Sequence, residues 1–504
     1  MEALSTVPKI KVSSAPRREP DSISLIFGDE IDPVVRARMR YSLQMFAAIY
    51  GYRFVAPSAD AAIICAYGFE GVARPAQSFR IPCRYRTRAI TTEAPALKRY
   101  QYAGEDFYLI HGLDEATGSP DWLGEIFEWL SSSLEFPIVE RDEGDRIPYS
   151  ATVFHKQGIS PMKSYAGIVM AWLQNALSGN SGNETLPRAK SPLNGVDHCV
   201  VCSHDIDFCH TKRSKTLVRL SKNLVLAGTE YQSASFLFSN LRMSRDLLAG
   251  KSVGDYIPGM LDAIESLGFR STLFAVAQAK HRRDPNYRIE EVASQLKVAA
   301  RRGFEIGVHG SYQSVVHGNT LKAESKALQN WTGETPAGSR QHWLRFDRHA
   351  SLFDAIRDAG LAYDSSLGFV ETCGFRNGAN FAFPPYDFGQ ERPYSFLEIP
   401  LVLMDGALHH ASRRSRSDPQ TIATQILHGS RKLGWGGIAV LWHNPLEPIQ
   451  VPEPINRVFW NLARDRGQHR EVWTSGAQFM RAVLTRYQDA GLLKELEINA
   501  ENAN

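Results

Sequence analysis

The sequence is poor in cysteine and carries little net charge. Its 504 residues include only 6 cysteines, and its formal net charge at pH 7 is +3. Six cysteines scattered over this length do not form a disulfide framework, so we expect free thiols in a reducing compartment. A net charge this small, without a basic tail, indicates no nucleic-acid partner.

Long apolar runs are missing as well. No stretch reaches the roughly 18 consecutive apolar residues that predict a membrane-spanning helix, and the first residues contain no apolar run long enough for a signal peptide. We therefore expect a cytoplasmic protein. The absence of a G-x-S-x-G motif disfavours a serine hydrolase, and the glycine-rich stretch at 434–437 lacks the pattern of a phosphate-binding loop.

What is present predicts more than one globular domain. Hydrophobic residues make up 43% and charged residues 22% of a chain longer than one ordinary domain. Residues 1–21 are polar and are expected to be disordered. Residues 22–177 predict a small α/β domain of unknown role, and 178–192, rich in Gly, Ser, Asn and Pro, predicts a linker. A second domain is expected over 193–490, followed by a C-terminal tail at 491–504.

Strand and helix patterns alternate from residue 198 onward. Most of the strand patterns are separated by amphipathic helical patterns, several of which end in glycine. This alternation predicts an α/β fold, a distorted seven-stranded (β/α) barrel, preceded by the smaller α/β domain. The predicted strands cover 198–206, 270–276, 304–309, 337–340, 361–366, 396–402 and 437–443.

Ionisable residues follow the ends of five of these strands. In barrels of parallel strands, reactive groups collect where strands end and loops begin. Any one of these residues has an ordinary structural explanation, such as a helix N-cap for Asp364 or simple burial for His443. Five strands that end this way would be unusual by chance. The residues are Asp205 and Asp207, His309, Arg340, Asp364 and His443.

Five short motifs at these ends resemble, in the same order, those of the polysaccharide deacetylases of carbohydrate esterase family four. The resemblance covers about 198–490 and implies a distorted barrel of about seven strands. It also implies a hydrolase that removes an N-acyl group, in the first instance acetyl, from an amino sugar. The motifs are S-H-D-I-D at 203–207, H-G-S-Y-Q at 309–313, G-S-R-Q-H at 338–342, Y-D-S-S at 363–366 and L-W-H at 441–443.

The resemblance assigns the base and the metal to the first strand ends. Asp205 would be the general base that activates a water molecule, and Arg340 would pair with it and keep it ionised. Asp207 and His309 would hold a divalent metal, in the first instance zinc, that polarises the amide carbonyl and the water.

The proton for the leaving amine is assigned to the last strand. His443 would be the general acid, and Asp364 would support its charged form. Substrate binding is expected from Tyr312, His342, Arg345 and Ser366.

One position departs from the family's pattern. The second motif normally supplies two histidines four residues apart, and Gln313 stands at the second place. An amide oxygen is a weaker zinc ligand than imidazole. Gln313 or solvent could complete the metal shell, His317 or the pair His409 and His410 could reach in, or the site could work without metal.

The stretch at 198–210, HCVVCSHDIDFCH, could alternatively be a cysteine metal site. In a strand, however, Cys199 and Cys202 are three residues apart and face opposite sides, and no second C-x-x-C pair exists. Asp205 and Asp207 are two apart and face the same side, which suits a base and a metal ligand that share one water. The aspartates, not the cysteines, carry the hypothesis.

Three basic segments lie near the expected site. We predict loops at 212–222 and 241–251, and a further basic loop at 409–416. They could form a solvated face, attract an anionic substrate such as a sugar nucleotide, a polyprenyl-phosphate sugar or an acidic glycan, or contact an anionic membrane surface.

The leading hypothesis is therefore a cytoplasmic deacetylase of an amino-sugar precursor in surface-polysaccharide biosynthesis. Two alternatives stay open: a metal-free amide hydrolase on the same barrel, and a catalytically inactive glycan-binding or scaffold protein. The sequence predicts neither the sugar nor the oligomeric state.

Overall fold

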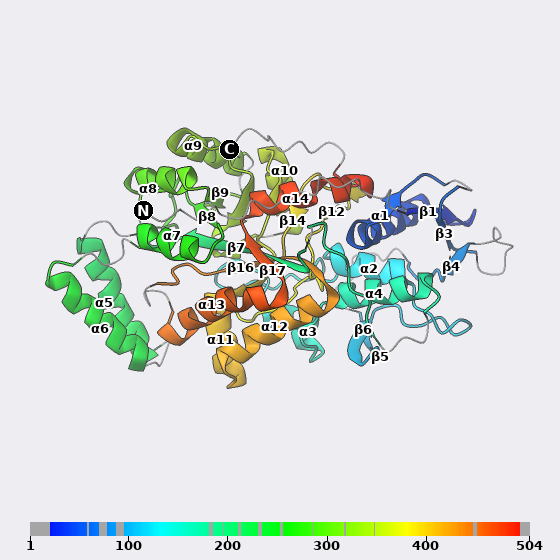
Figure 1. The fold of residues 1–504 in the computed structure, drawn as a ribbon, viewed down its shortest axis with the longest axis horizontal. Coiled ribbons are helices and arrows are strands. Elements are labelled where there is room, and N and C mark those ends of the chain that lie inside the picture. The colour runs from blue at the N-terminus through cyan, green and yellow to red at the C-terminus, as the bar shows by residue number, and fades with distance from the viewer. Residues whose placement is uncertain are drawn as a thin grey trace.

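The structure is a computed structural model of the whole chain (Figure 1). The predicted disorder at 1–21 and most of the predicted tail at 491–504 lie outside the residues that it describes. The described residues are 21–57, 60–69, 78–86, 95–180, 185–193, 195–209, 213–229, 234–251, 256–285, 287–316, 319–346, 348–446 and 451–493.

The N-terminal part of the chain forms a small parallel sheet covered by helices. The strand order is β2-β1-β3-β4, with β1 at Ser22–Phe27, β2 at Arg53–Phe54, β3 at Ile63–Tyr67 and β4 at Phe79–Ile81. Helix α1 (Pro33–Tyr50) starts where Asp32 accepts a hydrogen bond from the Val34 N–H, and it ends at Gly51, whose φ of 80° favours glycine. The other elements are the hairpin β5 (Lys98–Tyr102) and β6 (Glu105–Leu109), α2 (Trp122–Leu130), η1 (Tyr149–Ala151), α3 (Val153–Lys156) and α4 (Tyr165–Leu177).

The second part is a barrel of parallel strands, which confirms the predicted fold class. The main sheet has the order β14-β11-β10-β9-β8-β7-β16-β15, and β17 pairs with the first half of β7. Because β14 and β15 are consecutive pieces of one segment, the two ends of this order meet and the sheet curls on itself. The strands are β7 (His198–Ile206), β8 (Thr272–Ala275), β9 (Glu305–Gly310), β10 (Gly338–Gln341), β11 (Tyr363–Asp364), β14 (Leu397–Glu398), β15 (Leu401–Met404), β16 (Trp435–Leu441) and β17 (Glu471–Thr474).

Each of the seven predicted strand positions carries strand structure. The segment predicted as one strand at 396–402 is divided into β14 and β15, and β17 was not predicted. Around the sheet lie the helices α7 (Ile257–Ser266), α8 (Ile289–Arg301), α9 (Thr320–Thr332), α10 (His349–Ala359), α11 (Asp405–Ser415), α12 (Pro419–Leu433), α13 (Glu453–Asp465) and α14 (Gly476–Asp489) (Figure 1). The short elements are η2 (His342–Leu344), β12 (Tyr386–Asp387), β13 (Arg392–Pro393) and η3 (Arg466–His469).

The prediction of three basic loops is wrong, because each of these segments lies largely in a helix. Segments 212–222 and 241–251 fall mostly in α5 (Arg213–Thr229) and α6 (Ala234–Leu248), which pair as a helical hairpin. Segment 409–416 falls largely in α11. Their lysines and arginines are good helix formers, and no proline interrupts them.

The N-terminal part packs directly against the barrel. Arg38 pairs with Glu391 at 2.6 Å, Glu135 pairs with Arg376 at 2.8 Å, and one hydrophobic core runs through both parts. Residues 185–192 of the predicted linker lie against the barrel through buried Leu186 and Ala189, and Ala189 bridges to Gly434. No helix among the described residues is long and apolar enough to cross a membrane.

Candidate metal centre and active site

The site lies where β7, β9, β10 and β16 end. β7 is buried along its whole length, and it delivers Asp205 and, just beyond its end, Asp207. Burial raises the pKa of the Cys199 and Cys202 thiols, which keeps both neutral. Among the described residues, no cysteine joins a metal-binding group, so the strand interpretation of 198–210 is the one that agrees with the fold.

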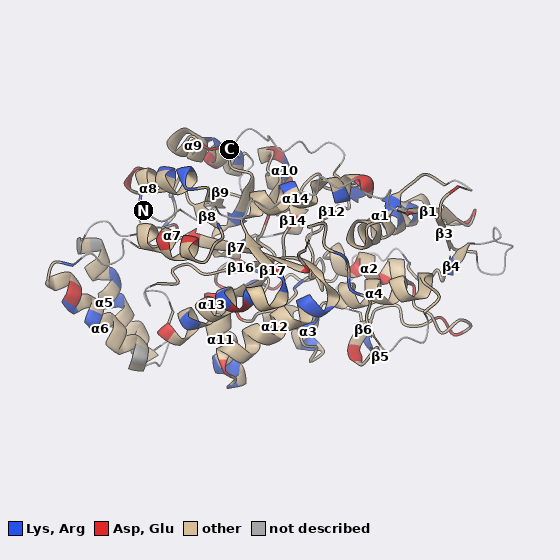
Figure 2. Ribbon diagram, in the orientation of Figure 1, with Lys and Arg blue, Asp and Glu red and all other residues tan. Residues whose placement is uncertain are grey.

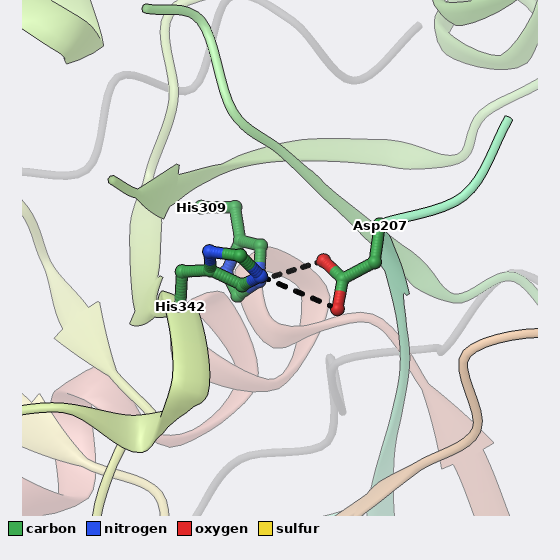
Figure 3. Close-up of side chains that lie close together, drawn as sticks. All are labelled: Asp207, His309 and His342. Atoms are coloured by element: carbon green, nitrogen blue, oxygen red, sulfur yellow. Dashed lines mark ion pairs between the residues drawn. The ribbon is translucent and has the colours of Figure 1, made fainter. Parts of the chain in front are cut away.

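Asp207, His309 and His342 form a compact cluster of metal-ligand atoms (Figure 3). One ligand atom from each residue lies within 4.8 Å of the others. His309 Nε2 is 3.2 Å from Asp207 Oδ1, and His342 Nε2 is 3.5 Å from Asp207 Oδ2. Two imidazoles and one carboxylate are a common ligand set of catalytic zinc sites, which leave a position for water.

The hydrogen bonds around His309 prepare it for a cation. Its Nδ1 lies 2.9 Å from the Arg340 carbonyl oxygen, so Nδ1 carries the proton and Nε2 presents its lone pair. Nε2 of His309 and Oδ1 of Asp207 are both buried, and neither has a hydrogen-bond partner. Buried polar atoms without partners are costly, and a divalent cation between them would satisfy both. The residues therefore fit a metal.

The His342 imidazole lies between two carboxylates, those of Asp207 and Asp284. Burial lowers its pKa, but Asp207 and Asp284 outweigh that effect and raise the pKa to about 9. Asp284 Oδ1 lies 3.7 Å from His342 Nδ1, and the Asp284 carboxylate is held by the backbone N–H groups of residues 280, 281 and 312. Sequence reasoning missed Asp284. It lies in a loop after β8, and no motif around it separates it from an ordinary surface aspartate.

The structure does not bring Gln313 to this cluster. The side chain of Gln313 is exposed, because the turn after β9 directs its neighbour Ser314 inward to hydrogen-bond Gln341. His342, expected to bind substrate, is the third member of the cluster instead. His317 lies outside the described residues, and His409 and His410 lie on α11 and are not members of the cluster.

Asp205 lies beside the cluster and is fixed by Arg340. Arg340 Nη1 donates to Asp205 Oδ1 at 3.0 Å, and Asp205 Oδ2 is 3.6 Å from His309 Nε2. Arg340 is fully buried and also donates to Ser203 Oγ, Ser365 O and Ser365 Oγ. The predicted pairing of Asp205 with Arg340 is thus present.

His443 approaches the cluster from β16. Its Nε2 is 3.5 Å from Asp207 Oδ2, while its Nδ1 lies 2.8 Å from Asp405 Oδ1. Burial lowers the pKa of His443, but Asp405 outweighs burial and raises it to about 10. The imidazole therefore carries a proton at neutral pH.

The prediction that Asp364 supports His443 is wrong. Asp364 accepts hydrogen bonds from Ser339 Oγ at 2.6 Å and the Ser366 N–H at 2.8 Å, and it faces Glu398. Burial raises the pKa of Asp364. Asp364 ends the short strand β11 and is held by neighbours within the sheet, whereas Asp405, the first residue of α11, hydrogen-bonds His443.

The other expected substrate residues divide between the core and the rim of the site. Ser366 is fully buried, and its Oγ accepts from the Gln341 N–H, which is a structural contact. Arg345 pairs with Asp145 at 2.6 Å and lies over the Tyr312 ring at 4.3 Å. Asp145 belongs to the N-terminal part, which therefore reaches the rim.

An exposed tryptophan adjoins His342. Trp343 is 39% exposed and has a φ of 66°, a left-handed conformation that bulky residues rarely adopt. The guanidinium groups of Arg283 and Arg146 lie 5.3 and 5.6 Å from its ring centre. Together these residues form an arginine–tryptophan cluster at the rim.

Comparisons with known proteins give structural likenesses only. No protein-family model and no curated protein matches this sequence. The solved structures that resemble the chain include the following three. A protein from Mycobacterium smegmatis assigned to the polysaccharide deacetylases is 14% identical, with a TM-score of 0.36, covering 58% of this chain and 92% of its own. A mutant of a pseudoenzyme of carbohydrate esterase family four with restored activity is 11% identical (TM-score 0.28; 56% and 66% covered). A peptidoglycan N-acetylglucosamine deacetylase is 12% identical (TM-score 0.28; 54% and 85% covered).

With TM-scores this low, the function of the chain has to be argued from its own side chains.

Proposed function

We propose that this protein is a metal-dependent hydrolase that removes an N-acyl group, in the first instance acetyl, from an amino sugar. The observation that supports it most is the pair of buried ligand atoms without a hydrogen-bond partner, His309 Nε2 and Asp207 Oδ1, which lie next to Asp205 and His443. An acid and a base on either side of a cation site are what hydrolysis of a stable amide requires.

The ligands of the metal would be Asp207, His309 and His342. A divalent metal, zinc in the first instance, supplies a Lewis acid for the acyl oxygen and lowers the pKa of a bound water. The rest of the chemistry belongs to the chain. Asp205 takes the proton of the attacking water, since its Oδ2 faces the cluster while its Oδ1 is held by Arg340.

His443 delivers a proton to the leaving nitrogen from Nε2. The Nδ1–H of His443 is held by Asp405, which fixes the ring and favours its protonated form. A protonated leaving group matters because an amine expelled as an anion is a very poor leaving group. Asp405 is therefore a positioning residue in place of Asp364.

The arginine–tryptophan cluster favours a substrate that carries an anionic group near the sugar. Among the described residues, no carboxylate pairs with Arg283, which contacts the Tyr312 hydroxyl and the Tyr312 and Trp343 rings. Arginine suits phosphate and carboxylate groups, and an exposed indole suits stacking against a ring. A phosphate-bearing amino sugar of surface-polysaccharide biosynthesis fits both, and the cytoplasmic location stays a prediction.

Release of acetate tests the proposal. The zinc-loaded chain is incubated with a panel of N-acetylated hexosamines, their 1-phosphates and their nucleotide conjugates, and free acetate and free amine are measured. We expect equimolar acetate and amine from at least one phosphate-bearing member. If no member of the panel releases acetate while zinc is bound, the hydrolase proposal fails. That result would favour a catalytically inactive glycan-binding or scaffold protein.

A further inference from the structure

The α5–α6 hairpin exposes large apolar side chains on the sides that its own packing does not use. Leu220 and Asn223 of α5 and Asn240 and Leu247 of α6 are buried, and Asn223 hydrogen-bonds Asn240 at 2.7 Å. At helical spacing, the side opposite these residues carries Val218 and Val225 on α5 and Phe238 on α6. These three side chains are 65%, 65% and 68% exposed.

The concentration of such residues sets the hairpin apart from the rest of the molecule. Leu241 and Leu248 of α6 are also exposed, by 45% and 77%. Elsewhere among the described residues, Val139, at 83%, is the one large apolar side chain that is more exposed than Leu248. Isolated exposed apolar residues are ordinary, but a group of this kind on one projecting element marks an interaction surface.

Basic side chains alternate with the apolar ones. Lys222 lies between Val218 and Val225, and Arg242 and Arg245 lie between Phe238 and Leu248. All three basic side chains are exposed. Asp246 is the one acidic residue among 213–229 and 234–251. Figure 2 shows the blue positions on both helices. Apolar side chains interleaved with lysine and arginine complement the interface of an anionic lipid bilayer.

The hairpin also projects from the body of the protein close to the site. It stands at the end of the molecule opposite the N-terminal sheet (Figure 1). It follows β7, and its base is tied to the site by Arg219, whose guanidinium lies 4.0 Å from the ring centre of Phe208, the neighbour of Asp207. α6 additionally contacts α13. A surface to which the hairpin binds would therefore lie beside the barrel end that carries the site.

We propose that the α5–α6 hairpin docks this protein on an anionic membrane surface. The hairpin lies on the surface with its apolar side chains in the headgroup region, and its lysines and arginines contact anionic lipid. Neither helix spans the bilayer. This docking is independent of the reaction that the barrel carries out, so either proposal can fail alone.

Vesicle binding by the full chain tests it. Binding is measured by flotation with phosphatidylcholine vesicles, with and without about a third of phosphatidylglycerol. We expect binding to the anionic vesicles only, weakened by added salt. A V225S/F238S/L248S variant should bind at least tenfold more weakly. A K222E/R242E variant should lose about fivefold or more for each charge removed, since a basic residue near such a surface contributes about that factor.

Matched variants elsewhere on the molecule provide the controls. V139S/V298S removes two exposed apolar side chains, and K322E/K326E reverses two exposed charges on α9; both should bind vesicles as the wild type does. Circular dichroism and the thermal transition check that each variant is folded. Absence of wild-type binding, or equal loss in the control variants, overturns the proposal. Self-association that the hairpin variants abolish, without vesicle binding, would assign the surface to a second copy of the chain instead.

Discussion

Strand β7 connects two histidine–carboxylate clusters at opposite ends of the barrel. At its first residue, His198 Nδ1 lies 2.7 Å from Glu471 and Nε2 lies 2.7 Å from Ser430 Oγ. Arg431 donates to both Glu471 oxygens at 2.8 and 2.9 Å. At the other end, His309 Nε2 and Asp207 Oδ1 have no hydrogen-bond partner.

The two clusters contain the same kinds of residue and differ in whether their polar atoms have hydrogen-bond partners. Both are buried and both join imidazole to carboxylate. Both ring nitrogens of His198 and both carboxylate oxygens of Glu471 have hydrogen-bond partners within 2.9 Å, as expected of a cluster that only stabilises the fold. Around His309 the partners stand 3.2 to 3.6 Å apart with lone pairs turned inward, which suits a cation. We infer that the first cluster stabilises the fold and the second performs chemistry.

The largest expected effect comes from Asp205→Asn. This variant removes the base while keeping the size of the side chain, so we expect hydrolysis to fall by about 10³-fold or more with little change in thermal stability. Turnover and the melting temperature are measured on the same sample. A variant that keeps its activity would show that Asp205 is not the base.

At the other end of β7, Glu471→Gln should act on stability alone. Burial raises the pKa of Glu471, but hydrogen bonds from His198 and Arg431 outweigh it and hold the pKa at about 2, below the ordinary value of 4.5. A lowered carboxylate pKa stabilises the fold above pH 4.5, and this stabilisation is lost as pH falls toward 2. It amounts to about 3 kcal/mol.

Denaturant unfolding from pH 7 to pH 3 measures this effect. The wild type should lose stability across that range, and the variant should be destabilised at pH 7 with a flatter profile. Its metal content should match that of the wild type. Loss of metal in Glu471→Gln would contradict the separation of the two ends.

A smaller effect is expected from Asp405→Asn. The protonated form of His443 is the active acid, so activity should fall as pH rises through its pKa, which Asp405 raises to about 10. Removing the carboxylate lowers that pKa, and the alkaline limb of kcat/KM should move to lower pH, with a loss of about tenfold to a hundredfold at pH 8. Asp364→Asn is the matched control and should leave the alkaline limb in place.

Much of the barrel could be predicted because its strands are local patterns. The run Val200 and Val201 between cysteines favours extension, and β7 has the predicted bounds at 198–206. The two-residue spacing of Asp205 and Asp207 was enough to place both carboxylates at one site. β17 was missed because its four residues carry no period that separates them from a loop.

The errors concern contacts between distant segments. Asp364 and Asp405 both follow strands, but Asp405 was not among the predicted site residues, because only the curl of the sheet brings it to His443. Gln313 stands where the resemblance expects a metal ligand, yet the turn after β9 directs its side chain outward. The histidine that faces Asp207 instead is His342, which directly precedes the left-handed backbone of Trp343. The sequence predicts loops where the hairpin lies, because its many basic residues obscure the helical spacing of its apolar ones.

The most direct test of the account is the metal content of three proteins. Wild type, His342→Ala and Gln313→Ala are each treated with chelator, reloaded with zinc and analysed for metal per chain, with circular dichroism to check folding. We predict about one zinc per chain in the wild type and in Gln313→Ala, and strongly reduced zinc in His342→Ala. Zinc that is lost in Gln313→Ala but kept in His342→Ala, or no zinc in the wild type, would contradict the proposed centre.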